Sequence, residues 1–246
     1  MTLGRGLALG SVLLLAIITS PAEATDVRAT LFDLALGTPL SHLPPQDSFT
    51  SYACGTNGGP PGTSLEGWAD FSRCAAEADG LREVYFEYDD AEEIQARATG
   101  DVSVGWHAGT AYRSFPLMTS ALFDAEGTLV GVRLITDPRP EQRKHDVFLH
   151  FRPRQEHALL GLYLMGPFGM LPGNCRDDPL SGGETPVLGV QIKRTCDRTD
   201  ATTGVSYHIE QRYLRRRGET DVDRRTGFLT QGNYLSETRA EMRLRR

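Results

Sequence analysis

The sequence predicts an α+β fold, in which a mostly antiparallel β-sheet carries a few short helices packed on one face. Three observations predict it. Several short segments alternate apolar and polar residues with the period of a β-strand, Gly and Pro residues separate these segments, and fewer segments space their apolar residues as a helix does.

The N-terminal half of the chain contains three strand signals. Residues 27–36 partly alternate and predict a first strand. Residues 81–88 (LREVYFEY) alternate apolar side chains with charged neighbours and give the clearest strand. The best hairpin joins residues 120–123 to residues 128–135 through a turn that ends at Gly127. Glycine adopts the positive φ that such a turn needs, so the two runs are expected to pair.

Helices are predicted between these strands and after them. Apolar residues near i, i+3 and i+7 predict a helix over residues 64–76. Two further helical pieces are expected over residues 141–151 and 155–165, and Pro153 separates them.

The C-terminal quarter reads as all β, with strands expected over residues 187–195, 204–217 and 228–244. Alternate residues of the middle strand are apolar or uncharged, and we expect them to share one face of the sheet. They are Val205, Tyr207, Ile209, Gln211 and Tyr213.

The first 24 residues have the three parts of a secretory signal peptide. Arg5 provides a positive start, residues 7–18 form an apolar run, and Ala22-Glu23-Ala24 matches an A-x-A cleavage site. The run is shorter than the roughly 20 residues that a membrane anchor requires. The sequence therefore predicts export, cleavage before Thr25 and a single mature domain over residues 25–246.

The four cysteines allow three disulfide connectivities. Short loops close at a lower entropic cost than long ones, which favours Cys54–Cys74 and Cys175–Cys196. Neither pair has the C-x-x-C spacing that structural zinc or redox sites usually show. Each pair also precedes a strand rich in Tyr and Glu. This weak echo leaves open two similar halves, 25–138 and 139–246, although coincidence is the favoured explanation.

Charge and hydropathy limit the partners. The net charge of −6 argues against nucleic acid, which needs a concentrated positive field. No segment after the signal peptide is long and apolar enough to span a bilayer, so we expect a soluble mature protein without a membrane span. No motif points to a cofactor, and no histidine pair has metal-ligand spacing, so neither a cofactor nor a metal is expected.

Five residues are candidates for binding. The arginine-rich segment 212–225 presents Arg212, Arg215 and Arg217, which suit recognition of carboxylates, although cross-strand ion pairs on an exposed face explain them more simply. Trp68 and Trp106 are candidate anchors for a partner, or ordinary core residues.

The sequence contains no catalytic motif. We therefore expect a non-enzymatic envelope or secreted module that binds a protein or a small ligand. The alternative is a periplasmic hydrolase whose residues meet only in the folded chain. Its candidates are His107, Asp137, His145 and His208.

Overall fold

The computed structural model describes a little over half of the chain. It covers residues 30–31, 34–44, 49–88, 110–112, 115–136, 161, 164–186, 189–216, 220–222, 229–231 and 235–245. The predicted signal peptide, the predicted helix at 141–151, Trp106 and Arg217 lie outside these residues, as do His107, Asp137 and His145.

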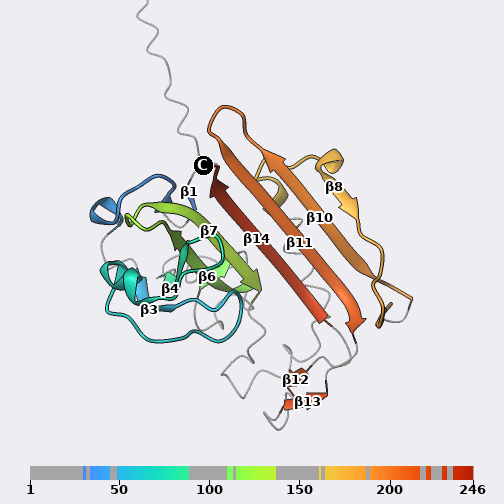
Figure 1. Cartoon of the computed structure of the whole chain (residues 1–246). Helices are drawn as coiled ribbons and strands as arrows, with labels where there is room; N and C mark the ends of the chain where they lie inside the picture. The colour runs from blue at the N-terminus through green and yellow to red at the C-terminus, as the bar shows by residue number, and fades with distance from the viewer. Residues whose placement is uncertain are drawn as a thin grey trace, which may run out of the picture.

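One ten-stranded antiparallel sheet dominates the described chain. Eight of its strands follow one another in the order β3-β4-β6-β7-β14-β11-β10-β8, and two short strands pair off this path (Figure 1). We call β3, β4, β6 and β7 the first half. Their bounds are Phe49–Cys54, Arg82–Tyr88, Phe115–Phe123 and Leu129–Thr136. We call β8, β10, β11 and β14 the second half. Their bounds are Cys175–Asp177, Ile192–Thr199, Val205–Arg216 and Leu235–Leu244.

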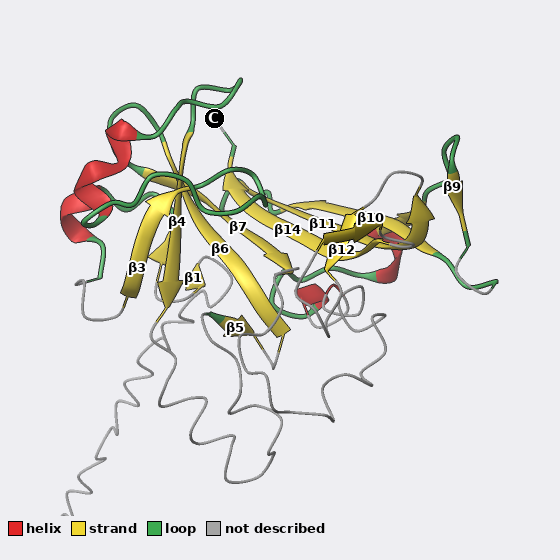
Figure 2. Cartoon of the chain, turned by 90° about the horizontal axis from the view of Figure 1, so that it is seen from below, coloured by secondary structure: helices red, strands yellow, loops and turns green. Residues whose placement is uncertain are grey.

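The two halves are meanders that meet at their last strands. Each runs from an edge strand, β3 or β8, towards the centre, where β7 pairs antiparallel with β14. The sheet bends near this seam, so that β3 and β4 stand steeply against the flatter layer of β14, β11 and β10 (Figure 2).

Short strands complete the fold. The two-residue strand β5 (Ala111–Tyr112) pairs with β6, and β9 (Glu184–Thr185) pairs with β11. Two separate two-stranded sheets join β1 (Thr30–Leu31) to β2 (Leu34–Ala35) and β12 (Thr220–Val222) to β13 (Leu229–Gln231). The single strand predicted over 27–36 is therefore wrong, because the chain reverses direction inside it.

The predicted hairpin is confirmed. Its strands are β6 and β7, and Gly127 adopts φ 79° in the turn between them. The strands predicted near 81–88 and 204–217 are confirmed as β4 and β11. The alternation expected in β11 is also confirmed, since Val205, Tyr207 and Ile209 are buried while the residues between them are partly exposed.

The main core lies on the face of the sheet that these β11 residues occupy, which we call the inner face. It is continuous across both halves, from Phe86 and Phe123 to Tyr207 and Met242. On the opposite, outer face, the described residues form two small buried apolar clusters, both in the first half.

The α+β prediction is wrong about helices. Strands make up 52% of the described residues and helix 11%, so the described part of the chain is mostly antiparallel β and carries no helical layer on the sheet. The 3₁₀ turns among the described residues are η1 (Leu40–His42), η3 (Trp68–Arg73) and η6 (Pro172–Asn174). Of the helix predicted over 155–165, residues 161, 164 and 165 are described and are helical.

The predicted helix over 64–76 shortens to η3 for two reasons. Ser64 lies opposite Ala53 at the edge of β3, where Thr63 O accepts from Cys54 N and Leu65 N donates to Tyr52 O, and this pairing holds the start of the segment extended. The apolar residues Leu65, Trp68 and Phe71 recur every three residues, which is the repeat of a 3₁₀ helix.

Both predicted disulfides are confirmed. Cys54–Cys74 ties the end of β3 to the residue after η3, and Cys175–Cys196 joins directly opposed residues of β8 and β10. No described cysteine is free.

Candidate interaction surface

The outer face of the second half carries a dense array of charged and polar side chains. In each strand the residues that alternate with the buried ones point to this face. We call it the charged face. It comprises Lys193, Thr195, Asp197 and Thr199 of β10; Ser206, His208, Glu210 and Arg212 of β11; and Glu237, Arg239, Glu241 and Arg243 of β14.

Opposite charges face each other across neighbouring strands of the charged face. The register sets Arg212 against Glu237, Glu210 against Arg239, and His208 against both Asp197 and Glu241. Such cross-strand pairs stabilise a sheet by roughly 0.2–1 kcal/mol each. The face is therefore highly charged locally, but its charges largely compensate each other within the sheet.

His208 lies at the centre of this pattern. Its Nδ1 is 2.6 Å from Asp197 Oδ1, and its Nε2 is 3.2 Å from Glu210 Oε1. The hydrogen bond to Glu210, helped by Asp197, raises the pKa of His208 to about 9 against the opposing effect of burial. The same hydrogen bond lowers the pKa of Glu210. At neutral pH both ring nitrogens carry protons, so His208 is a cation and is unable to accept a proton.

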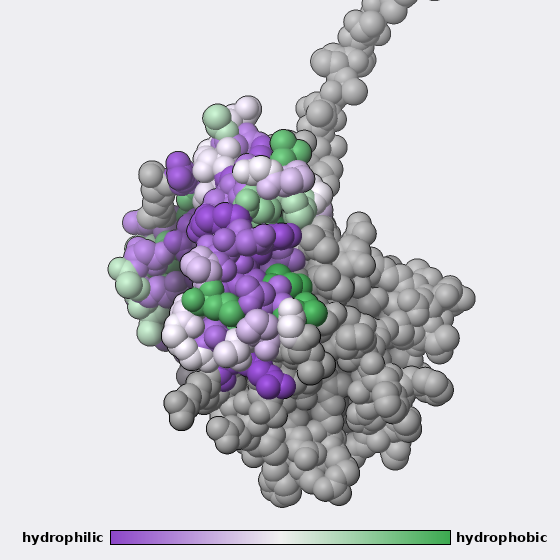
Figure 3. All heavy atoms as spheres, turned by 90° about the vertical axis from the view of Figure 1, so that its right-hand side faces the viewer, coloured by the Kyte–Doolittle hydropathy of each residue, from purple (hydrophilic) through white to green (hydrophobic). Residues whose placement is uncertain are grey.

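The ion pairs continue to the edge of the sheet. The Arg176 guanidinium in β8 contacts Asp197 at 2.9 Å and Asp178 at 3.3 Å. Burial alone would raise the pKa of Asp197, but hydrogen bonds from His208 and Arg176 outweigh it and lower that pKa. Hydrophilic residues cover most of the described surface in the view onto this edge (Figure 3).

A buried arginine joins the charged face to the first half. Arg133 of β7 keeps only 8% of its side chain exposed. Its Nη1 and Nη2 donate to both oxygens of Glu77 at 2.7 and 3.1 Å, and its Nε donates to Glu241 at 3.0 Å. Glu83 lies 3.1 Å from Nη1. Burial opposes the charge, but the hydrogen bond to Glu77 and the three carboxylates raise the pKa of Arg133.

The outer face of the first half is covered by its own chain. We call residues 55–62, which follow Cys54, the strap. The strap and the sheet together enclose a hollow of only about 10 Å³, so little space separates them. The sheet residues that line it are Glu83, Tyr85, Met118, Ser120 and Ile135.

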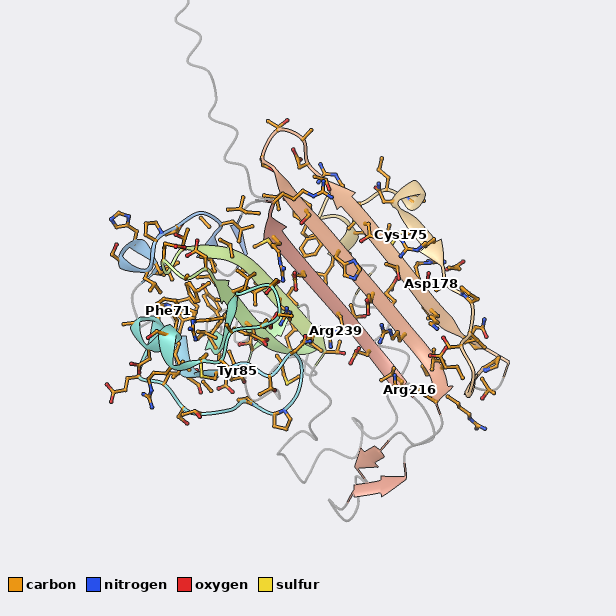
Figure 4. All side chains as sticks on the ribbon, viewed as in Figure 1. Phe71, Tyr85, Cys175, Asp178, Arg216 and Arg239 are labelled. Atoms are coloured by element: carbon orange, nitrogen blue, oxygen red, sulfur yellow. A yellow bond between two sulfur atoms is a disulfide. The ribbon has the colours of Figure 1, made fainter. Side chains whose placement is uncertain are left out.

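Asn57 anchors the strap to both halves. Its N–H donates to Glu83 Oε2 at 2.7 Å, whereas its main-chain and side-chain oxygens accept from Arg239 at 3.3 and 2.5 Å. Figure 4 shows Arg239 near this seam and Cys175 and Asp178 at the far edge of the second half.

A larger hollow of about 250 Å³ lies at the edge formed by β8 and β10. Its charged groups already have partners, since Arg194 contacts Asp177 at 2.8 Å and Lys193 contacts Glu184 at 2.7 Å. The lining residues are Asp177, Asp178, Gln191, Ile192, Lys193, Arg194 and Gln211.

The structure separates the binding candidates taken from the sequence. Arg212 lies on the charged face and contacts Glu210 at 2.5 Å, while Arg215 is exposed at the end of β11. Trp68 is buried in an aromatic cluster, 4.8 Å from Tyr52 and 5.0 Å from Phe49 between ring centroids, and so belongs to the core. Arg217 and Trp106 fall outside the described residues.

Of the four hydrolase candidates only His208 is described, and it lies on a sheet face between two carboxylates. Within the described ranges, no group of three or more His, Cys, Asp or Glu is placed to hold a metal ion. No helix there is long and apolar enough to cross a membrane.

Sequence reasoning missed Arg133 and its three carboxylates. The available signal was one charged residue inside the otherwise uncharged run of β7 (LVGVRLIT). Glu77 and Glu241 lie 56 and 108 residues away along the chain, so no local pattern pointed to them.

Comparison of the chain with protein-family models, with curated proteins and with solved structures gives no match.

Proposed function

We propose that residues 25–246 are exported and act as a non-enzymatic module that binds another envelope or secreted protein through the charged face. One observation carries the proposal. The strap covers the outer face of the first half, whereas within the described residues the charged face of the second half reaches solvent, with Asp197 51% and His208 40% exposed.

The geometry favours a protein over a small molecule. Small-molecule sites are usually concave and mostly apolar. The charged face is polar rather than apolar, and the charged groups of the 250 Å³ hollow are already paired. A broad polar surface with alternating charges suits a protein partner, because complementary charges speed association and exclude wrong partners. His208 is a cation whose two ring nitrogens already contact carboxylates, so it is not placed to accept a proton from a substrate. This favours a role in binding over a role in catalysis.

Export rests on separate observations. The N-terminal pattern is that of a signal peptide. The two disulfides are consistent with an oxidising compartment outside the cytoplasm.

Site-specific photocrosslinking in cells that make the full chain tests the binding proposal. A photoreactive residue in place of Arg212 should capture a discrete partner, and the same residue in place of Thr202, in the turn after β10, should not. A swapped variant, Arg212→Glu with Glu237→Arg, keeps one positive and one negative side chain opposite each other but exchanges their positions. It should bind the captured partner at least about tenfold more weakly, because its charges no longer match those of the partner.

Two results would contradict these proposals separately. Capture from both positions alike, or unchanged affinity of the swapped variant, would exclude the charged face as the binding surface. Intact-mass analysis that finds residues 1–24 attached, or four free thiols, would exclude export.

A further inference from the structure

The strap contains an Asn-Gly pair at the position where the two halves of the sheet are joined. We propose that Asn57 is a site of spontaneous deamidation, and that Arg239 of the second half controls its rate. The proposal does not depend on the identity of a binding partner.

Asn57 and Gly58 form the centre of a tight turn. Their φ angles are 54° and 94°, and Gly59 N donates to Thr56 O at 3.3 Å, as in a type I′ turn. Glycine is favoured at 58, because a φ of 94° is one that residues with a side chain rarely adopt, and a Cβ there would lie 2.7 Å from Ile135 Cδ1. Asn57 is exposed, and Gly58 N–H makes no hydrogen bond within the described part of the chain.

These features suit ring closure. Gly58 N loses its proton to solvent base and attacks Asn57 Cγ. The bond from Cγ to the side-chain nitrogen breaks, and that nitrogen leaves as ammonia after taking up a proton. Water then opens the cyclic imide to aspartate or isoaspartate, so the net reaction consumes one water and releases one ammonia. Glycine favours this step because it has no side chain to hinder its nitrogen.

Arg239 acts as a brake on this reaction. Closing the ring requires rotation about ψ and χ1 of Asn57 to bring Cγ to Gly58 N. Arg239 holds the Asn57 carbonyl oxygen through Nη1 and the side-chain oxygen through Nη2, so it restrains both rotations at once. Because the donor is charged, these hydrogen bonds are stronger than neutral ones.

The product changes the contacts of the strap. A new carboxylate at 57 replaces a neutral acceptor opposite Arg239 and adds a negative charge near Glu83, which already accepts the N–H of residue 57. Isoaspartate also inserts a methylene group into the main chain of the turn. Both products alter the attachment of the strap to the first half.

Peptide mapping by mass spectrometry tests the proposal. The native mature protein, the Arg239→Ala variant and the unfolded chain are incubated at pH 8, and the conversion of Asn to Asp or isoaspartate is followed at residue 57. Conversion should be slowest in the native protein and about tenfold faster in Arg239→Ala, which is the effect of losing a charge-assisted hydrogen bond. Asn174, which precedes Cys175, is the internal control and should convert far more slowly.

Arg243→Ala is the matched variant. It removes a guanidinium from the same strand and face, which contacts Asp79 and Glu241 but not Asn57, so its rate at residue 57 should equal that of the native protein. Equal rates in the native protein and Arg239→Ala would exclude control by Arg239. An absence of conversion at residue 57 in the unfolded chain would exclude the site itself.

Discussion

The two halves of the sheet share an order of strands but differ in the side chains and segments that make up their outer faces. In the first half Ala53, Tyr85, Met118 and Ile135 form a small apolar cluster, over which the strap lies. In the second half the equivalent face is built of ion pairs, and within the described residues His208 and Asp197 on it are 40% and 51% exposed. One face of a sheet can therefore be stabilised either by a segment of its own chain packed over it or by compensation of charge between its strands.

Arg133 lies at the boundary between the two halves, and its replacement should lower the free energy of unfolding the most. Arg133→Ala leaves Glu77, Glu83 and Glu241 as buried or half-buried carboxylates without their shared cation. We expect the free energy of unfolding to fall by about 3–5 kcal/mol. Urea denaturation followed by Trp fluorescence measures it.

Arg243→Ala serves as the comparison, because Arg243 is more exposed and pairs with Asp79 and Glu241. Its cost should be about 1 kcal/mol or less. Equal losses from the two variants would show that burial at the seam does not set the energy of these ion pairs.

Loss of either disulfide should lower the free energy of unfolding by a similar amount, but the two losses should loosen different parts of the structure. Their cysteines are 20 and 21 residues apart, so replacing either pair by alanine should lower the free energy of unfolding by about 3 kcal/mol. Only the loss of Cys54–Cys74 should loosen the strap and speed hydrogen exchange in β4. Faster exchange in β4 after loss of Cys175–Cys196 would contradict this assignment.

His208 should make the stability of the second half depend on pH. Its pKa rises from the ordinary value of 6.5 to about 9 on folding. The stabilisation by its ion pairs is therefore complete below pH 6.5 and disappears as the pH rises through 9. Because 40% of the side chain is exposed, we expect His208→Gln to cost only about 1 kcal/mol or less at pH 6, and nothing at pH 10.

Thermal unfolding of the native protein and His208→Gln at both pH values measures this difference. A gap that persists at pH 10 would mean that His208 stabilises the sheet through packing rather than charge.

The smallest effects on stability are expected for Arg212 and Arg215 of β11. Arg212 has a carboxylate partner in Glu210, so Arg212→Ala should cost up to about 1 kcal/mol. Arg215 is exposed at the strand end, and Arg215→Ala should change the free energy of unfolding by less than about 0.5 kcal/mol. The reverse order in urea denaturation would contradict the placement of Arg212 in the ion-paired array.

Residue order alone was enough to predict the features that depend on neighbours in the chain. Alternation located β4 and β11, Gly127 located the β6–β7 turn, and short separations selected both disulfides. Each of these rests on a local conformational preference or on the low entropy cost of closing a short loop.

The helical content and the candidate surface depended on contacts between distant segments. Pairing with the edge of β3 limits η3 to Trp68–Arg73. The charged face exists only because β14 lies between β7 and β11, which sets Arg133 against Glu241 and Glu210 against Arg239. A strand pattern states which residues share a face, but only the order and register of the strands in the folded sheet determine which charges meet.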